Sequence, residues 1–197
     1  GNYGIPEKKD TNLNWPFESE KIQVSGLIIS DYSEFYSHFD AKMSLGEWLK
    51  ESKVPAICGV DTRELTKVIR NIGSPLGKML HDKNNIDFYD PNIINQVEKV
   101  SVKQPMEYGT GSKKVILIDL GAKNNILRSL IDRGLKVKRV PWNYDFLDED
   151  FDGVMISNGP GDPQLATTTI TNVKKLLEKD RPVMGICMGN QILALAS

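Results

Sequence analysis

The sequence predicts an α/β fold in which a mixed β/α domain is followed by a doubly wound parallel sheet. In the second half, short apolar runs rich in β-branched residues alternate with segments whose apolar residues recur at helical spacing. Strands that alternate with helices in this way form parallel sheets with right-handed crossovers. A third observation is a cysteine, Cys187, which stands between glycines where an apolar strand signal gives way to an apolar helix signal.

The alternation in the second half defines each expected element. The strand signals cover 113–119, 136–140, 153–157 and 183–186, and the helix signals cover 124–133, 167–178 and the residues from 188 onward. In a parallel sheet, functional residues gather beyond the carboxyl ends of the strands. The loops that follow the first, third and fourth strands are therefore the candidate functional segments, namely 119–121, 158–163 and Cys187.

The first half has shorter and less regular signals. Strands are expected at 23–30 and 54–60, and a short amphipathic helix at 44–52. A polar stretch with Pro105, Gly109 and Gly111 interrupts the pattern before the parallel sheet begins. The predicted domains are therefore residues 1–104 and 113–197, joined by a linker at 105–112.

A further helix is expected after Asp61. This residue is suited to cap the helix, and Glu64 stands three residues later, as in a capping box. Leu65, Val68 and Ile69 then recur at helical spacing and are predicted to form the buried stripe of the helix.

Composition limits the class of protein. The 197 residues are 40% hydrophobic and 26% charged, and their net charge of −1 argues against nucleic-acid and membrane-surface partners. No apolar run approaches the roughly 20 residues that span a bilayer. The two cysteines, Cys58 and Cys187, are far apart and lack metal-ligand spacing, so we expect a reducing compartment, the cytoplasm, with neither a disulfide nor a metal site. The chain opens without methionine and stops inside a helical pattern, which predicts an internal fragment.

Cys187 is placed as a nucleophile would be. At a strand-to-helix turn, unpaired backbone N–H groups and the positive end of the helix dipole favour a thiolate. The N–H of Met188 and the glycine-rich loop at Gly159 and Gly161 could stabilise the oxyanion that forms when a thiolate attacks a carbonyl carbon. The alternatives are a buried structural cysteine and, for the loop alone, a simple tight turn.

A thiol nucleophile also needs a general base, normally histidine. The only histidines are His38 and His81, both in the first half, where we expect them on the surface or in loops. This chain therefore lacks a complete catalytic triad.

These motifs resemble a known enzyme family. The segment 185–191 (GICMGNQ), with 157–163 (SNGPGDP) upstream, resembles the class I, or triad, glutamine amidotransferases. The segment 60–66 (VDTRELT), followed by Arg70, Gly73 and Gly77, is similar to the N-terminal domain of the small, glutamine-hydrolysing subunit of carbamoyl-phosphate synthetase. Asp119, Gly121, Lys123, the run 125–128 (NILR) and the pair 133–134 (RG) also resemble that subunit where its glutaminase domain begins.

The resemblance implies a fold and an activity. The fold is the small-subunit N-terminal domain followed by the first part of a flavodoxin-like glutaminase domain. The activity is hydrolysis of glutamine to glutamate and ammonia, which passes to a large synthetase subunit that uses ATP and bicarbonate for pyrimidine or arginine synthesis. ATP and magnesium are thus expected on that partner, and no cofactor on this chain.

The resemblance also implies roles for individual residues. Cys187 would be the nucleophile, and the N–H groups of Met188 and Gly159 would stabilise the oxyanion. Gly161 and Gln191 would hold the glutamine. Asn190 stands where many relatives carry histidine. The family's glutamine-binding serine would precede the first residue and its His-x-Glu pair would follow the last, so the chain alone is expected to be inactive.

Three other interpretations are open. The first is a glutaminase of the anthranilate or GMP synthetase type, which would lack the domain around 61–66. The second is a non-catalytic scaffold that docks and regulates a larger synthetase. The third is a flavodoxin-like module that binds flavin or phosphate near 158–162, although no phosphate loop rich in serine or threonine follows the first strand.

Overall fold

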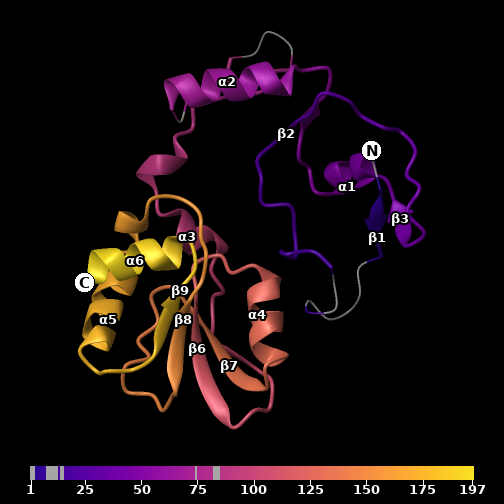
Figure 1. Cartoon of the computed structure of the whole chain (residues 1–197). Helices are drawn as coiled ribbons and strands as arrows, with labels where there is room; N and C mark the ends of the chain where they lie inside the picture. The colour runs from indigo at the N-terminus through magenta and orange to yellow at the C-terminus, as the bar shows by residue number, and fades with distance from the viewer. Residues whose placement is uncertain (1–2, 8–12, 14–15, 74, 82–84) are drawn as a thin grey trace. The chain divides into compact units, whose positions relative to one another are not determined.

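The computed structural model describes residues 3–7, 13, 16–73, 75–81 and 85–197. The chain divides into two compact units between Tyr89 and Asp90 (Figure 1). This boundary differs from the predicted linker at 105–112, because β5 (Met106–Tyr108) lies inside that segment and joins the sheet of the second unit. The flanking proline and glycines suggested a linker, but here they bound a short edge strand.

The second unit is built on a five-stranded sheet with the order β5-β7-β6-β8-β9. Four of its strands are parallel, and β5 pairs antiparallel with β7. Helix α4 lies on one face of the sheet, and α5 and α6 lie on the other (Figure 1). The elements are β6 (Lys113–Asp119), α4 (Asn124–Ile131), β7 (Leu135–Pro141), β8 (Gly153–Ile156), α5 (Thr167–Leu177), β9 (Val183–Gly185) and α6 (Met188–Ala196). The predicted α/β fold with a doubly wound parallel sheet is confirmed.

The strand order reverses between β6 and β8. From β6 the chain crosses to β7 on one side, whereas β8 and β9 lie on the other side. Because β6 and β8 are paired in parallel, with Ile118 opposite Ile156, the loops that follow them begin at the same edge of the sheet. A reversal of this kind opens the crevice in which doubly wound sheets bind ligands.

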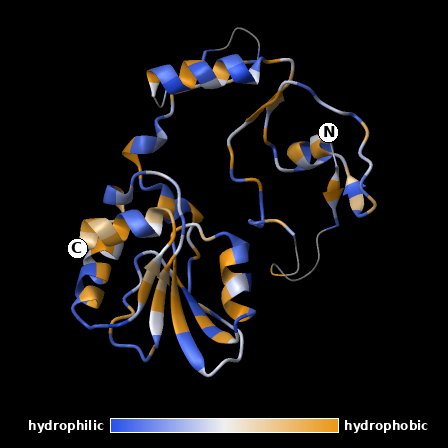
Figure 2. Cartoon of the chain, viewed as in Figure 1, coloured by the Kyte–Doolittle hydropathy of each residue, from blue (hydrophilic) through white to orange (hydrophobic). Residues whose placement is uncertain are grey.

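The core of this unit lies on both faces of the central strands. Ile116, Leu117 and Ile118 of β6 are at most 1% exposed, as expected for a strand that helices cover on both faces. Figure 2 shows hydrophobic residues along the central strands and mixed hydrophobic and hydrophilic residues on α4 and α5. Burying each such aliphatic side chain stabilises the fold by roughly 1.5–3 kcal/mol.

The residues just before the sheet also belong to the second unit. A 3₁₀ turn (Pro91–Ile93) and α3 (Gln96–Val100) precede β5. Val97 of α3 is 1% exposed and is part of the core cluster. The Oγ of Ser101 accepts a hydrogen bond from the N–H of Trp142 at 3.0 Å. Residues 90–104 therefore pack with the sheet that follows them.

The first unit contains short strands and two helices. The expected strands at 23–30 and 54–60 are reduced to the parallel pair β2 (Leu27–Ile28) and β4 (Ala56–Ile57). A second pair, β1 (Ile5–Pro6) and β3 (Ala41–Met43), is antiparallel. Helix α1 (Leu45–Glu51) is capped by Ser44, which forms a capping box with Glu47.

Helix α2 (Thr62–Ile72) follows the predicted cap at Asp61. The Asp61 carboxylate accepts hydrogen bonds from the N–H groups of Arg63 and Glu64, whereas the Glu64 side chain pairs with Lys67. The predicted buried stripe is wrong, because no residue of α2 is buried and Val68 is 50% exposed. In the described part of this unit the strands are two or three residues long, so they offer no broad sheet face for the stripe to cover.

Within the described residues, no helix is long and apolar enough to cross a membrane.

Candidate functional site

Cys187 lies at the sharp turn between β9, which ends at Gly185, and α6, which begins at Met188; we call this turn the crease. Its φ of 53° and ψ of −111° form a backbone conformation that glycine adopts far more readily, and its side chain is exposed. A residue with a Cβ pays about 1–3 kcal/mol for such a conformation and keeps it only where its surroundings require it. Here Ile186 N–H donates to the Ile156 carbonyl at 3.0 Å, and Gly189 N–H donates to the Ser157 carbonyl at 3.1 Å. Both sides of the crease are thus bonded to the end of β8.

The two glycines around Cys187 allow the helix to approach the sheet. A Cβ on Gly189 would lie 2.8 Å from the carbonyl carbon of Ile156, and a Cβ on Gly185 would lie 2.6 Å from the Asn190 nitrogen. Both distances are shorter than packed carbon atoms tolerate. The glycines on either side of Cys187 are therefore required by backbone packing.

The glycine-rich loop is adjacent to the start of α6. A Cβ on Gly159 would lie 2.9 Å from the Sδ of Met188, the residue that follows Cys187. Among the described residues, no hydrogen-bond acceptor pairs with the N–H of Gly159 or of Met188. The two predicted sources of oxyanion donors are thus neighbours, and their N–H groups are available to a ligand.

Other predicted site residues surround this crease. Gly161 has a φ of +85°, and a Cβ there would lie 3.1 Å from the side chain of Gln96 in α3. Gln191 and Asn190 are exposed on the first turn of α6, and their N–H groups donate to the Cys187 carbonyl at 3.2 and 3.0 Å. The structure therefore brings the first turn of α6 and the 158–161 loop to one edge of the sheet.

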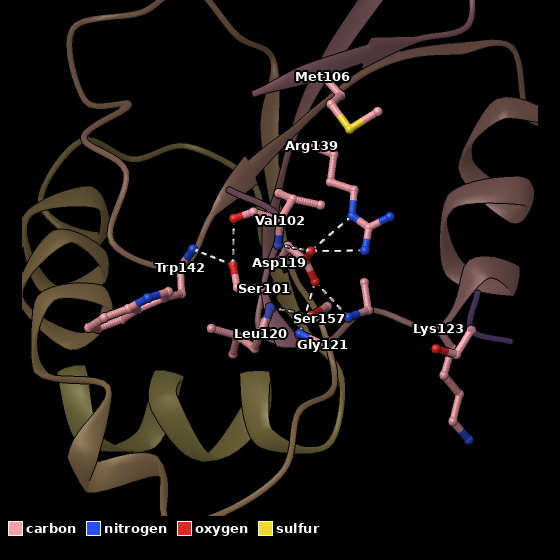
Figure 3. A network of polar contacts seen from close by, with 12 residues as sticks. Ser101, Val102, Met106, Asp119, Leu120, Gly121, Lys123, Arg139, Trp142 and Ser157 are labelled. Atoms are coloured by element: carbon pink, nitrogen blue, oxygen red, sulfur yellow. Dashed lines mark hydrogen bonds and ion pairs between the residues drawn. The ribbon is translucent and has the colours of Figure 1, made fainter. Parts of the chain in front are cut away.

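A buried carboxylate lies beside this edge, in the candidate segment 119–121, although the sequence assigned it no role. Asp119, at the end of β6, is fully buried, and its Oδ2 accepts from Arg139 Nε at 3.0 Å and from the Val102 N–H at 2.8 Å (Figure 3). Its Oδ1 accepts from the N–H groups of Gly121 at 2.9 Å and Ala122 at 2.7 Å. A buried charge with this many donors is well compensated.

The loop after β6 is hydrogen-bonded to the loop after β8. The Leu120 N–H donates to Ser157 Oγ at 2.9 Å, and the Lys123 N–H donates to Asn158 Oδ1 at 3.1 Å. Asn158 Nδ2 in turn donates to the Gly121 carbonyl at 3.2 Å. Both loops were predicted as separate candidates, and the polar residues that end the two strand signals, Asp119 and Ser157, were the signal that could have linked them.

The sequence of the second unit contains no histidine. His38 and His81 are both exposed in the first unit, and His38 Nδ1 accepts a hydrogen bond from the Asp40 N–H. In the described ranges, no group of three or more His, Cys, Asp or Glu side chains is arranged to hold a metal ion.

Each half of the chain matches a known protein family. Residues 1–79 match the family described as "Carbamoyl-phosphate synthase small chain, CPSase domain". Residues 116–197 match the family described as "Glutamine amidotransferase class-I".

Curated relatives align over the whole chain. The "Carbamoyl-phosphate synthase [ammonia], mitochondrial" proteins of Rattus norvegicus and Homo sapiens are each 48% identical over 203 positions, and the chain spans 14% of their length. The "Multifunctional protein CAD" of Squalus acanthias is 47% identical over 204 positions, and the chain spans 9% of its length. The chain therefore belongs to the carbamoyl-phosphate synthase small-chain family and includes a class-I glutamine amidotransferase domain.

Proposed function

We propose that this chain is part of the glutaminase portion of a carbamoyl-phosphate synthase, with Cys187 as the nucleophile that hydrolyses glutamine. The observation that supports the proposal most directly is the exposed thiol at a strained strand-to-helix crease, next to a loop in which the Gly159 N–H has no hydrogen-bond acceptor among the described residues. Strain at an exposed nucleophile, maintained by tight packing behind it, is typical of functional sites.

The proposed reaction is acyl transfer. The Cys187 thiolate attacks the side-chain amide carbon of glutamine, and the oxyanion that forms is stabilised by the N–H groups of Met188 and Gly159. The C–N bond then breaks, the nitrogen takes up a proton and leaves as ammonia, and a thioester to Cys187 remains. Water attacks the thioester, which releases glutamate and restores the thiol. Loss of one oxyanion donor in such a site raises the barrier by about 3–4 kcal/mol.

We assign Gly161 and Gln191 to glutamine binding, because both lie at the same edge of the sheet as Cys187. The general base has to come from outside the second unit, whose sequence has no histidine, so we expect the chain alone to be inactive. The partner would be the large synthetase portion, where ATP and magnesium act, and this chain would need no cofactor. A cytoplasmic location fits two cysteines that are both free.

A non-catalytic docking scaffold is the second candidate. The rat and human relatives are named for ammonia rather than for glutamine, although both align over the whole chain. Such a protein would need the fold but no nucleophile, whereas this chain has a thiol at the crease. A glutaminase of the anthranilate or GMP synthetase type is disfavoured, because residues 1–79 match the carbamoyl-phosphate synthase small-chain domain.

Replacement of Cys187 by serine in the full-length protein tests the proposal. We expect loss of glutamate release from glutamine, while carbamoyl phosphate synthesis from free ammonia continues at the wild-type rate. Cys58→Ser is the matched control and should leave both activities unchanged. A wild-type protein that uses ammonia but releases no glutamate would support the scaffold. Loss of both activities in Cys187→Ser would mean that Cys187 is structural.

A further inference from the structure

We propose that Asp119 is a positioning residue for glutamine hydrolysis, which acts by holding the Gly159 N–H in place beside the start of α6. The inference rests on the proposed function of Cys187. Asp119 is fully buried, and the 158–161 loop connects its contacts to the exposed thiol. Asp119 is therefore not proposed to touch the substrate.

The first step is the anchoring of the carboxylate. Asp119 is 0% exposed, and the side chain of Arg139, its ion-pair partner at 2.8 Å, is 12% exposed. Arg139 lies on β7 in register with Leu117, so the ion pair joins two central strands. Charge-assisted hydrogen bonds in such a dry setting are strong and leave the carboxylate little freedom to move.

The second step leads from Asp119 to Asn158. The other carboxylate oxygen of Asp119 holds the N–H groups of Gly121 and Ala122, which closes the turn after β6. This turn presents the Gly121 carbonyl to Asn158 Nδ2 and the Lys123 N–H to Asn158 Oδ1. The amide plane of Asn158 is therefore held at both of its ends, and Gly159 follows Asn158 directly in the chain.

The third step is the contact of the 158–161 loop and Ser157 with α6. The Ser157 Oγ accepts from Leu120 N–H, and the Ser157 carbonyl accepts from Gly189 N–H in α6. A Cβ on Gly159 would press against the Leu120 carbonyl oxygen and the Met188 Sδ. Gly159 is thus confined between the turn that Asp119 closes and the helix that begins at Met188.

This arrangement predicts an effect on the chemical step. An oxyanion donor acts only on charge that develops in the transition state, so its displacement lowers kcat and leaves KM nearly unchanged. Displacements of about 1 Å can lower rates by about 100-fold. In Asp119→Asn, the amide has only one acceptor oxygen for donors on two sides, so an NH₂ group must face either Arg139 or the Gly121 and Ala122 N–H groups.

The test uses the full-length protein with Asp119→Asn, Asn158→Asp and the double variant. Asn158→Asp keeps the oxygen that accepts from Lys123 but removes the donor to Gly121. We expect each single variant to lower kcat for glutamine about 10- to 100-fold, with KM within about threefold of wild type and ammonia-dependent synthesis unchanged. Because both residues act through one path, the double variant should be little worse than the poorer single variant.

Asp152→Asn is the matched control. Asp152 accepts from Lys113 Nζ at 2.7 Å and from the Lys114 N–H at 2.8 Å, so it also joins an ion pair to a backbone bond, but at the start of β6. The kcat of the Asp152→Asn variant for glutamine should equal that of the wild type. If Asp119→Asn does not fold, Asn158→Asp alone decides, because it leaves the buried ion pair intact.

The outcomes separate this inference from the proposed function. Glutaminase activity that survives Cys187→Ala would overturn the proposed function whatever Asp119 does. The positioning role is wrong if Cys187→Ala is inactive and any of three results is found for the variants at 119 and 158. The first is an unchanged wild-type kcat, and the second is an equal loss of glutamine-dependent and ammonia-dependent activity. The third is that the effects of the two single substitutions on kcat add independently in the double variant.

Discussion

The backbone of Gly189 lies directly against the carbonyl group of Ile156, with no room for a side chain between α6 and the end of β8. The Ile156 carbonyl also accepts from the N–H of Ile186, and the neighbouring Ser157 carbonyl accepts from Gly189. This contact seats the start of α6 on the sheet and sets the position of the Cys187 crease.

Gly189→Ala should destabilise the second unit by about 1–3 kcal/mol, because the added methyl group has to push α6 away from β8. Urea unfolding of this unit in the 197-residue chain can be followed by the fluorescence of Trp142 after Trp15 and Trp48 are replaced by phenylalanine, since those are the only other tryptophans in these 197 residues. An unfolding free energy equal to that of the protein with Gly189 intact would contradict the packing role of Gly189.

Cys187→Gly should be more stable than Cys187→Ala by about 1–2 kcal/mol. Glycine adopts a φ of 53° and a ψ of −111° without the steric penalty that a Cβ meets. At Cys58, which is not among the residues with a positive φ, the order should be reversed, since glycine there only adds freedom to the unfolded chain. Thermal unfolding of the four variants checks both orders, and the same order at both positions would mean that the crease is not strained.

Ser157→Ala should cost about 1–3 kcal/mol of stability and lower kcat for glutamine. The Ser157 side chain is the acceptor for the buried N–H of Leu120, which would then lack a partner. Unfolding free energy and steady-state kinetics of the full-length protein measure the two effects. A stable variant with wild-type kcat would show that the bond between the two loops is dispensable.

Glu149 should make stability depend on pH in the acid range. Burial raises the pKa of its carboxyl, but hydrogen bonds from Lys138 and Tyr144 outweigh burial and hold the pKa below its ordinary value of 4.5. The folded state therefore binds fewer protons, so the stabilisation is complete above about pH 4.5 and is lost as the pH falls through the folded pKa. Glu149→Gln should flatten this part of the curve of unfolding free energy against pH.

Salt provides the control for Glu149. Glu107 also has a lowered pKa, because of its hydrogen bond to Lys136, but both side chains of that pair are well exposed. The pH dependence due to Glu107 should fade in high salt, whereas that due to Glu149 should persist. Equal loss of both in salt would contradict the partly buried setting of Glu149.

The second half of the fold could be predicted from the sequence because its signals are local. The run at 113–119 became β6 with the predicted bounds, and the glycines around Cys187 indicated the crease. The edge strand β5 and helix α3 were missed, since each is short and gains its stability from pairing or packing with residues far along the chain.

The supporting contacts of the site could not be predicted in the same way. The ion pair of Asp119 and Arg139 depends on the register of β6 against β7, which no local pattern specifies. The stripe on α2 has the correct helical spacing, but burial requires a partner surface, and spacing alone does not supply one.

The most direct test of the account is covalent labelling of the full-length protein with an electrophilic glutamine analogue, followed by peptide mass spectrometry. The account predicts that the label forms on Cys187 much faster than on Cys58, and that added glutamine protects Cys187. Both thiols are exposed, so Cys58 serves as an internal reference for general thiol reactivity. Equal labelling of the two cysteines, without protection by glutamine, would contradict the assignment of Cys187 as the nucleophile.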